Sequence, residues 1–169
     1  MPSIECLPIS GGRLLMIRGS RDGAQQEALS SIGGAVRHGE SPLQACLRLV
    51  KDETGFYVEP SCAAVVFAAS AGQATDYCLI FVAAAPSQAL GPGPSARDSL
   101  VWIDLDELTG REDITELDRV IIPRVLGSSA PIAIFLDIDP ATTPPARTLR
   151  EISNIDVARL SPLVFAVTS

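Results

Sequence analysis

The stretch of residues 32–56 constrains the fold of this chain more than any other part of the sequence. It opens with the pair Gly33-Gly34, continues through a short polar loop, and then shows the pattern of a helix start. Ser41 can accept a hydrogen bond from a free backbone N–H, and Gln44, three residues later, completes a capping-box pattern. Gly55 can adopt the left-handed conformation that ends many helices. The sequence therefore predicts a glycine loop followed by a capped helix.

This predicted helix, residues 41–54, has two distinct faces. An apolar stripe at helical spacing is expected to be buried, and its members are Leu43, Cys46, Leu47 and Val50. Asp52 and Glu53 project away from that stripe, with Leu49 between them in projection. Glu40, in the loop before the helix, can lean towards the same acidic face. Carboxylates beside a glycine loop suit a hard cation such as Mg²⁺, which keeps several waters and bridges phosphate oxygens.

The same residues resemble the Nudix box, GX5EX7REUXEEXGU, in which U is a bulky apolar residue. The positions that match it are Gly34, Glu40, Arg48, Val50, Glu53, Gly55 and Phe56. Asp52 replaces the first Glu of the EE pair and keeps a carboxylate there. Leu49 replaces the Glu of the RE pair, and an apolar side chain cannot bind a metal ion. The intact spacing of this long box implies the α+β fold of the family, an α/β/α sandwich with a mixed sheet.

The resemblance also implies an activity, the hydrolysis of a diphosphate linkage in a nucleoside diphosphate derivative, here weakened by Leu49. In the family, the box carboxylates hold a divalent metal ion that activates water. Carried over to this chain, the implied metal ligands for Mg²⁺ or Mn²⁺ are Glu40, Asp52 and Glu53. The implied catalytic residues are Glu53 and Arg48, since the box arginine orients the carboxylates. Gly34 and Arg37 are the candidate ligand contacts, because a loop guanidinium pairs well with phosphate oxygens.

Other interpretations of the same residues stay open. The acidic face could be an ordinary solvated surface with an i,i+4 pair between Arg48 and Asp52. Leu49 could pack under a loop, leaving a catalytically inactive module that binds a nucleotide-like ligand or a protein partner. A distant carboxylate could instead complete the site, and the candidates are Asp76, Asp98, Glu107, Glu112 and Asp113. Trp102 and Tyr77 could stack on a base, or could serve only in packing.

Charge and cysteine usage limit the classes of partner. A net charge of −7 argues against binding a nucleic acid polymer or an anionic membrane, since both favour basic patches. The four cysteines are widely spaced and one lies on the predicted buried stripe, so we expect no disulfide and a cytoplasmic location. No apolar run approaches the ~18 residues of a membrane span. The sequence thus favours a small-molecule ligand, and leaves a homodimer open.

The rest of the chain alternates apolar runs with turns. Strands are expected at residues 4–9, 13–18, 57–69, 77–85, 100–103 and 132–138. The first two form a hairpin, a short helix follows residue 103, and a longer helix over residues 114–125 contains Pro123. We expect residues 1–139 to form the Nudix-like domain. Residues 140–169 are expected to form a Pro-rich linker and a C-terminal tail of unassigned role.

Overall fold

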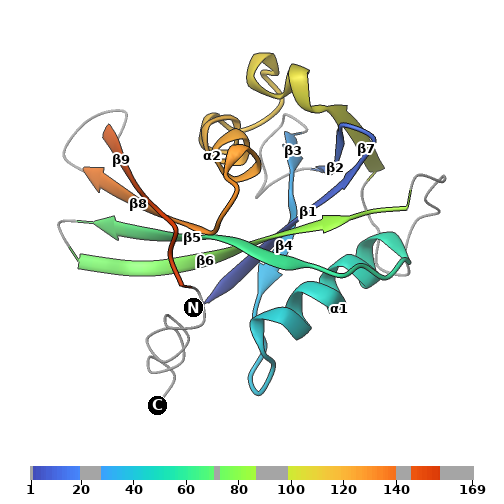
Figure 1. Ribbon diagram of the computed structural model, residues 1–169, viewed down its shortest axis with the longest axis horizontal. Helices are drawn as coiled ribbons and strands as arrows, with labels where there is room; N and C mark the ends of the chain where they lie inside the picture. The colour runs from blue at the N-terminus through green and yellow to red at the C-terminus, as the bar shows by residue number, and fades with distance from the viewer. Residues whose placement is uncertain (1, 20–27, 71–72, 87–98, 140–145, 157–169) are drawn as a thin grey trace.

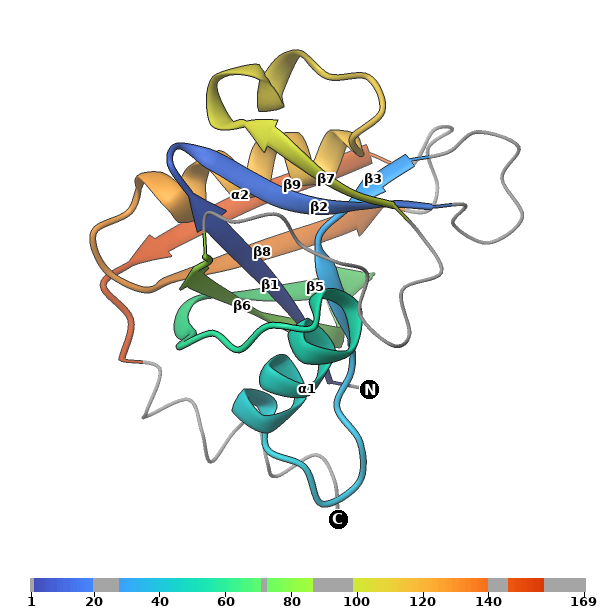
Figure 2. The same cartoon turned by 90° about the vertical axis from the view of Figure 1, so that its right-hand side faces the viewer.

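The computed structural model describes residues 2–19, 28–70, 73–86, 99–139 and 146–156. Within these ranges, nine strands form one mixed sheet, and the two α-helices lie on opposite sides of it (Figures 1 and 2). The α/β/α sandwich with a mixed sheet that the sequence predicts is therefore present. Residues 20–27 and 87–98, between predicted strands, and residues 140–145 of the predicted Pro-rich linker lie outside the described residues.

All six predicted strands are present, and three others were not predicted. The strands are β1 (Ser3–Ser10), β2 (Arg13–Gly19), β3 (Ala28–Ser30), β4 (Ile32–Ala35), β5 (Ser61–Ser70), β6 (Gln73–Ala84), β7 (Ser99–Asp104), β8 (Ile132–Asp139) and β9 (Ala146–Ser153). The helices are α1 (Pro42–Thr54), the 3₁₀ helix η1 (Leu105–Gly110) and α2 (Glu116–Gly127). Strand β5 starts after Pro60, not at Tyr57, since proline cannot donate to a strand ladder. Pro123 lies inside α2 and does not end it.

The sheet has the strand order β3-β2-β1-β6-β5-β8-β9, with β4 added beside β1 and β7 beside β2. The pairs β1–β6 and β5–β8 are parallel, and the other pairs are antiparallel. The predicted hairpin of β1 and β2 is confirmed. Its turn needs Gly11 and Gly12, whose φ angles of 55° and 76° lie in the left-handed region.

Two apolar cores fill the sandwich, one on each face of the sheet. In β2, Leu14 and Met16 join the core under α2, while Leu15, between them, joins the core under α1. From the helices, Ile122 of α2 packs into the first core and Val50 of α1 packs into the second. The central strands are thus covered on both faces, which explains their almost continuous apolar sequences.

The predicted buried stripe of α1 is wrong at Leu43 and only partly met at Leu47. Leu43 is 46% exposed, whereas the buried residues of this helix are Pro42, Ala45, Cys46, Val50 and Thr54. The helix is rotated so that Ala45 faces the sheet and Leu49 is brought against β4, where Gly34 leaves room for it. Leu47 is only partly buried, and Asp52 is partly exposed as predicted.

The C-terminal part of the chain adds a strand that the sequence did not indicate. Strand β9 pairs antiparallel with β8 over its whole length, from Ile132↔Ser153 to Asp139↔Ala146. The division of the chain at residue 139 stays a prediction, but this strand extends the sheet beyond that point.

All four cysteines are free thiols, as predicted. Cys6 and Cys46 are buried together between β1 and α1. The hydrogen bond with Cys46, together with burial, raises the pKa of the Cys6 thiol well above its usual range. None of the helices in the described ranges has the length and apolar character of a membrane span.

Candidate active site

The predicted capping of α1 is confirmed at both ends. Ser41 Oγ accepts a hydrogen bond from the Gln44 N–H at 3.2 Å, and Gln44 Oε1 accepts one from the Ser41 N–H at 2.8 Å. At the other end, Gly55 adopts a left-handed φ of 78° and donates its N–H to the Lys51 carbonyl. These caps fix where α1 begins and ends, and so fix which way its charged side chains project.

A bidentate ion pair ties the loop before α1 to the middle of the helix. Arg48 Nε donates to Glu40 Oε1 at 2.7 Å, and Arg48 Nη2 donates to Glu40 Oε2 at 2.8 Å. The Arg37 N–H donates to the same Oε2 at 3.1 Å, and Arg48 Nη2 also reaches the Ala35 carbonyl at 3.4 Å. The partner of Arg48 in this pair is thus Glu40, from the loop, and Asp52 adds only a weaker electrostatic attraction.

The same contacts explain the charge state of Glu40. The hydrogen bond from Arg48, together with the Arg37 N–H and the two positive charges, lowers the pKa of Glu40 to about 2. Both side chains of the pair are largely buried, with 19% of Arg48 and 15% of Glu40 exposed. The loop between β4 and α1 is therefore held in one position by a charged, two-bond clamp.

Replacing Glu40 by glutamine is expected to lower the free energy of unfolding at pH 7 by about 1 kcal/mol. Because folding lowers the pKa of this carboxyl from 4.5 to about 2, its contribution is complete above about pH 4.5. The contribution is lost as the pH falls from there towards 2. Urea unfolding of wild type and Glu40→Gln should therefore converge in acid. Glu59→Gln, at an exposed residue, is the control, and a difference that stayed constant down to pH 2.5 would contradict this account.

The glycine pair lies in a strand and not in a loop, which corrects the sequence prediction. Gly33 and Gly34 belong to β4 and pair with Glu5 and Ile4 of β1. A Cβ on Gly33 would stand 2.6 Å from the Ile4 carbonyl oxygen, so only glycine allows this close approach. The two adjacent glycines were visible in the sequence, but the sequence did not indicate that Gly33 is needed for the close approach of β4 to β1.

Leu49 packs directly on the second glycine. A Cβ on Gly34 would meet the two terminal carbons of Leu49 at 3.3 Å and 3.4 Å. The leucine is partly buried and packs against the core under α1. The sequence left open that Leu49 packs under a loop, but the residue that it contacts, Gly34, belongs to strand β4. The box position that carries a metal-binding glutamate in the family is here an apolar contact between α1 and β4.

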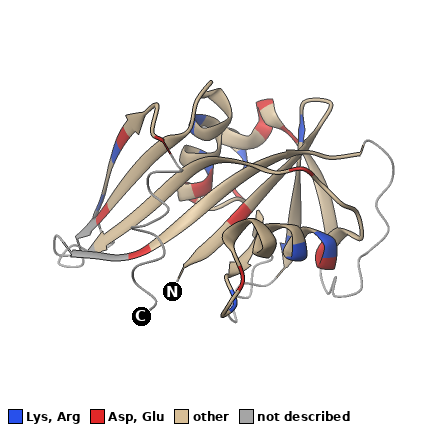
Figure 3. Ribbon diagram, turned by 60° about the horizontal axis from the view of Figure 1, so that its bottom comes forward, with Lys and Arg blue, Asp and Glu red and all other residues tan. Residues whose placement is uncertain are grey.

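The structure brings only some of the predicted metal ligands together. Asp52 and Glu53 are neighbours in the last turn of α1 and are partly exposed, while Glu40 is held by Arg48. Figure 3 shows charged residues on the loop before α1 and along this helix. Within the described ranges, no group of three or more His, Cys, Asp or Glu side chains is arranged to hold a metal ion. The assignment of Glu40, Asp52 and Glu53 as ligands therefore stays a prediction.

Two of the distant carboxylates have partners elsewhere. Asp113 accepts hydrogen bonds from Arg111 at 2.7 Å and 2.9 Å and pairs with Arg18 at 3.4 Å. Glu107 pairs with the same Arg111 at 3.8 Å. These ion pairs tie the segment after η1 to β2, which is a structural role. Asp98 lies outside the described residues.

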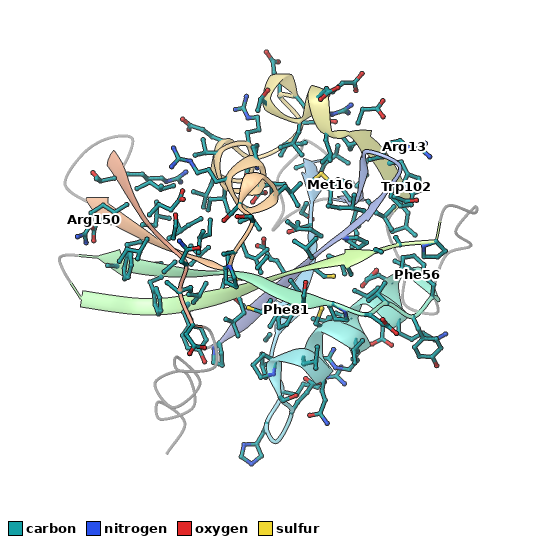
Figure 4. All side chains as sticks on the ribbon, viewed as in Figure 1. Arg13, Met16, Phe56, Phe81, Trp102 and Arg150 are labelled. Atoms are coloured by element: carbon teal, nitrogen blue, oxygen red, sulfur yellow. The ribbon has the colours of Figure 1, made fainter. Side chains whose placement is uncertain are left out.

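Trp102 of strand β7 lies beside Arg13 of the neighbouring strand β2. The Arg13 guanidinium carbon lies 5.5 Å from the centre of the Trp102 ring. In Figure 4, Arg13, Trp102 and Phe56 lie at the same end of the molecule, with Phe56 just beyond α1. Trp102 is partly buried against the core under α1, so it stays a candidate for stacking on a ligand and already contributes to packing.

The fold and this site place the chain in a known class. A model of the NUDIX domain matches residues 2–125. The chain therefore belongs to the Nudix family, and its predicted fold is confirmed. No curated protein matches it.

Solved structures show the same fold at low sequence identity. The mutator MutT protein from Bacillus halodurans is 19% identical, with a TM-score of 0.64 over 89% of this chain and 96% of that one. An ADP compounds hydrolase is 21% identical, with a TM-score of 0.61 over 75% of this chain and 70% of that one. A MutT NUDIX hydrolase from Burkholderia pseudomallei is 23% identical, with a TM-score of 0.58 over 73% and 96%.

Proposed function

We propose that this protein is a hydrolase that cleaves a diphosphate linkage in a nucleoside diphosphate derivative, at a rate lowered by Leu49. The observation that carries the proposal is the bidentate pair between Arg48 and Glu40. It holds the glycine strand and its loop against a capped helix whose last turn presents Asp52 and Glu53. The family match and the similarity to solved structures that include an ADP compounds hydrolase support the same substrate class.

The residues present fit a divalent ion of the kind that Nudix hydrolases generally use. Mg²⁺ is commonly held by one or two carboxylates, with water and substrate phosphate completing its shell. Asp52 and Glu53 can supply those carboxylates, while Leu49 cannot supply a third. Both oxygens of Glu40 accept hydrogen bonds from Arg48, so Glu40 can bind the ion only through the lone pairs that these bonds leave. The chemistry that a bound Mg²⁺ or Mn²⁺ supplies is neutralisation of phosphate charge and activation of water.

The residues of the chain have separate roles in this proposal. Arg48 acts as a positioning residue, because its two hydrogen bonds keep Glu40 and the loop in place. Glu53 acts as a metal ligand, and a role as general base is the lesser alternative. Gly34 leaves room for Leu49 to pack against β4, so its contact with a ligand would be through the backbone. Arg37, exposed on the loop, can contact a phosphate.

A second function is favoured by one specific observation, the packing of Leu49 on Gly34. With an apolar side chain filling this place, the fold keeps its shape without the central ligand. Such a chain would serve as a module that binds a nucleotide-like ligand without cleaving it.

Incubation of the full chain with a panel of nucleoside diphosphate derivatives separates the two functions. We expect phosphate-containing products to appear with Mg²⁺ or Mn²⁺ and not with chelator. Thermal stabilisation by a panel member without any product would support the binding module instead.

A further inference from the structure

The outer edge of the sheet is an exposed strand that ends the strand order. Strand β9 pairs with β8 and, within the described ranges, with no other strand. Of the six consecutive residues 147–152 in this strand, five are exposed and one, Leu149, is partly buried. The exposed residues are Arg147, Thr148, Arg150, Glu151 and Ile152. An open edge presents unpaired N–H and C=O groups to any further strand. Ile152, an apolar side chain, is 54% exposed there.

The charged residues of β9 are complementary to those of a second copy of the same strand, which favours that strand as the partner. In a two-fold antiparallel pair, facing side chains lie on the same side of the sheet, so the axis passes through a residue. With the axis at Leu149, Arg147 of each copy faces Glu151 of the other, and Thr148 faces Arg150. With the axis at Arg147, Arg150 or Glu151, like charges face each other, which is destabilising.

We propose that this protein forms a homodimer in which β9 pairs antiparallel with β9 of a second copy, centred on Leu149. The sheet then continues through both subunits, with two Arg147–Glu151 pairs flanking the axis. Arg147 has no ion pair inside its own subunit among the described residues, so its charge is available to the second copy. Glu151 Oε2 pairs with Arg124 of its own subunit at 3.5 Å, and Glu151 Oε1 accepts a hydrogen bond from Ser153 Oγ at 3.3 Å. Each carboxylate oxygen has a second lone pair, which can accept from Arg147 of the second copy.

Arg150 is held within its own subunit and offers a matched control. Its guanidinium lies 5.8 Å from the centre of the Phe135 ring and pairs with Asp137 at 3.4 Å. The Phe135 ring in turn stacks on the Phe67 ring, with 5.1 Å between the ring centres. In the dimer Arg150 faces the neutral Thr148, so its charge makes no pair across the axis. Figure 4 shows Arg150 at the opposite end of the molecule from Trp102 and Phe56.

The proposed interface is small. A strand pair alone buries less than the ~1,600 Å² of a standard interface, so we expect a dimer that dissociates on dilution in the micromolar range. Sedimentation equilibrium across that range should show the mass rising from 17.8 kDa towards twice that value. This proposal is independent of the proposed catalytic function, since neither β9 nor its charges belong to the candidate active site.

Charge exchange tests both the interface and its register. Arg147→Glu and Glu151→Arg should each weaken self-association by about tenfold or more, since each places two like-charged pairs across the axis. An equimolar mixture of the two variants should associate as tightly as wild type, because their charges are then complementary. Arg150→Gln should leave the association unchanged. Circular dichroism and thermal melting confirm that each variant is folded.

A wild-type mass that stays at 17.8 kDa throughout would overturn the proposal. A mixture that associates no better than either variant alone would overturn the Leu149-centred register. Loss of association in Arg150→Gln equal to that in Arg147→Glu would show that the interface does not depend on these charge pairs.

Discussion

Replacing Leu49 by glutamate is expected to raise metal-dependent diphosphate hydrolysis by about tenfold or more. Mutation of residues that support metal sites in other proteins changes metal affinity or activity by about this factor. The new carboxylate would lie between Asp52 and Glu53 in projection and beside Gly34, giving three acidic side chains within a single turn of α1. Affinity for Mg²⁺ should rise for the same reason.

The same substitution should cost stability in chelator. Leu49 is partly buried on Gly34, so its loss and the added like charge should lower the free energy of unfolding by about 1–2 kcal/mol. Mg²⁺ should restore part of that loss. Leu49→Gln is the control, because glutamine has the shape of glutamate without its charge. This variant should gain neither activity nor metal-dependent stability. If Leu49→Glu behaves like Leu49→Gln in both assays, the pocket is not built for this chemistry.

Replacing Gly33 by alanine is expected to lower the free energy of unfolding by about 2–3 kcal/mol, or the melting temperature by about 4–12 °C. The added Cβ would stand 2.6 Å from the Ile4 carbonyl oxygen, and backbone cannot move aside as a flexible side chain can. Strand β4 would have to separate from β1, which also displaces the loop that Arg48 holds.

Gly127→Ala is the matched control for this test. Its added Cβ meets nothing within 4 Å, and its φ is not in the left-handed region, so stability should be unchanged or slightly raised. Chemical denaturation of the two variants beside wild type gives the comparison. A Gly33→Ala variant as stable as Gly127→Ala would show that β4 is not bound as tightly to β1 as the structure indicates.

The local features of the site were predictable because they depend on residues close in sequence. The capping box of Ser41 and Gln44 and the left-handed Gly55 follow from side-chain chemistry within one turn. The central strands were predictable from their apolar runs. The family resemblance rested on spacing that the structure preserves.

What could not be predicted depends on contacts between distant segments. The apolar spacing of α1 predicted a buried Leu43, but in the folded protein Leu43 is exposed and Leu49 packs on Gly34 of β4. Similarly, the i,i+4 spacing offered Asp52 as the partner of Arg48, whereas the ion pair in the folded protein is with Glu40 of the loop. Strand β9 has exposed residues on most of its length, so it carried no periodic apolar signal.

The central claim is that the carboxylates at the end of α1 support metal-dependent hydrolysis, and Glu53→Gln tests it most directly. On the panel substrate that wild type cleaves fastest with Mg²⁺, the variant should lose about 10–100-fold or more in kcat/KM. Glu59→Gln, prepared in the same way, should match wild type, so that a loss confined to Glu53→Gln excludes a contaminating activity. Equal rates for Glu53→Gln and wild type would contradict the claim and show that this helix does not carry the reaction.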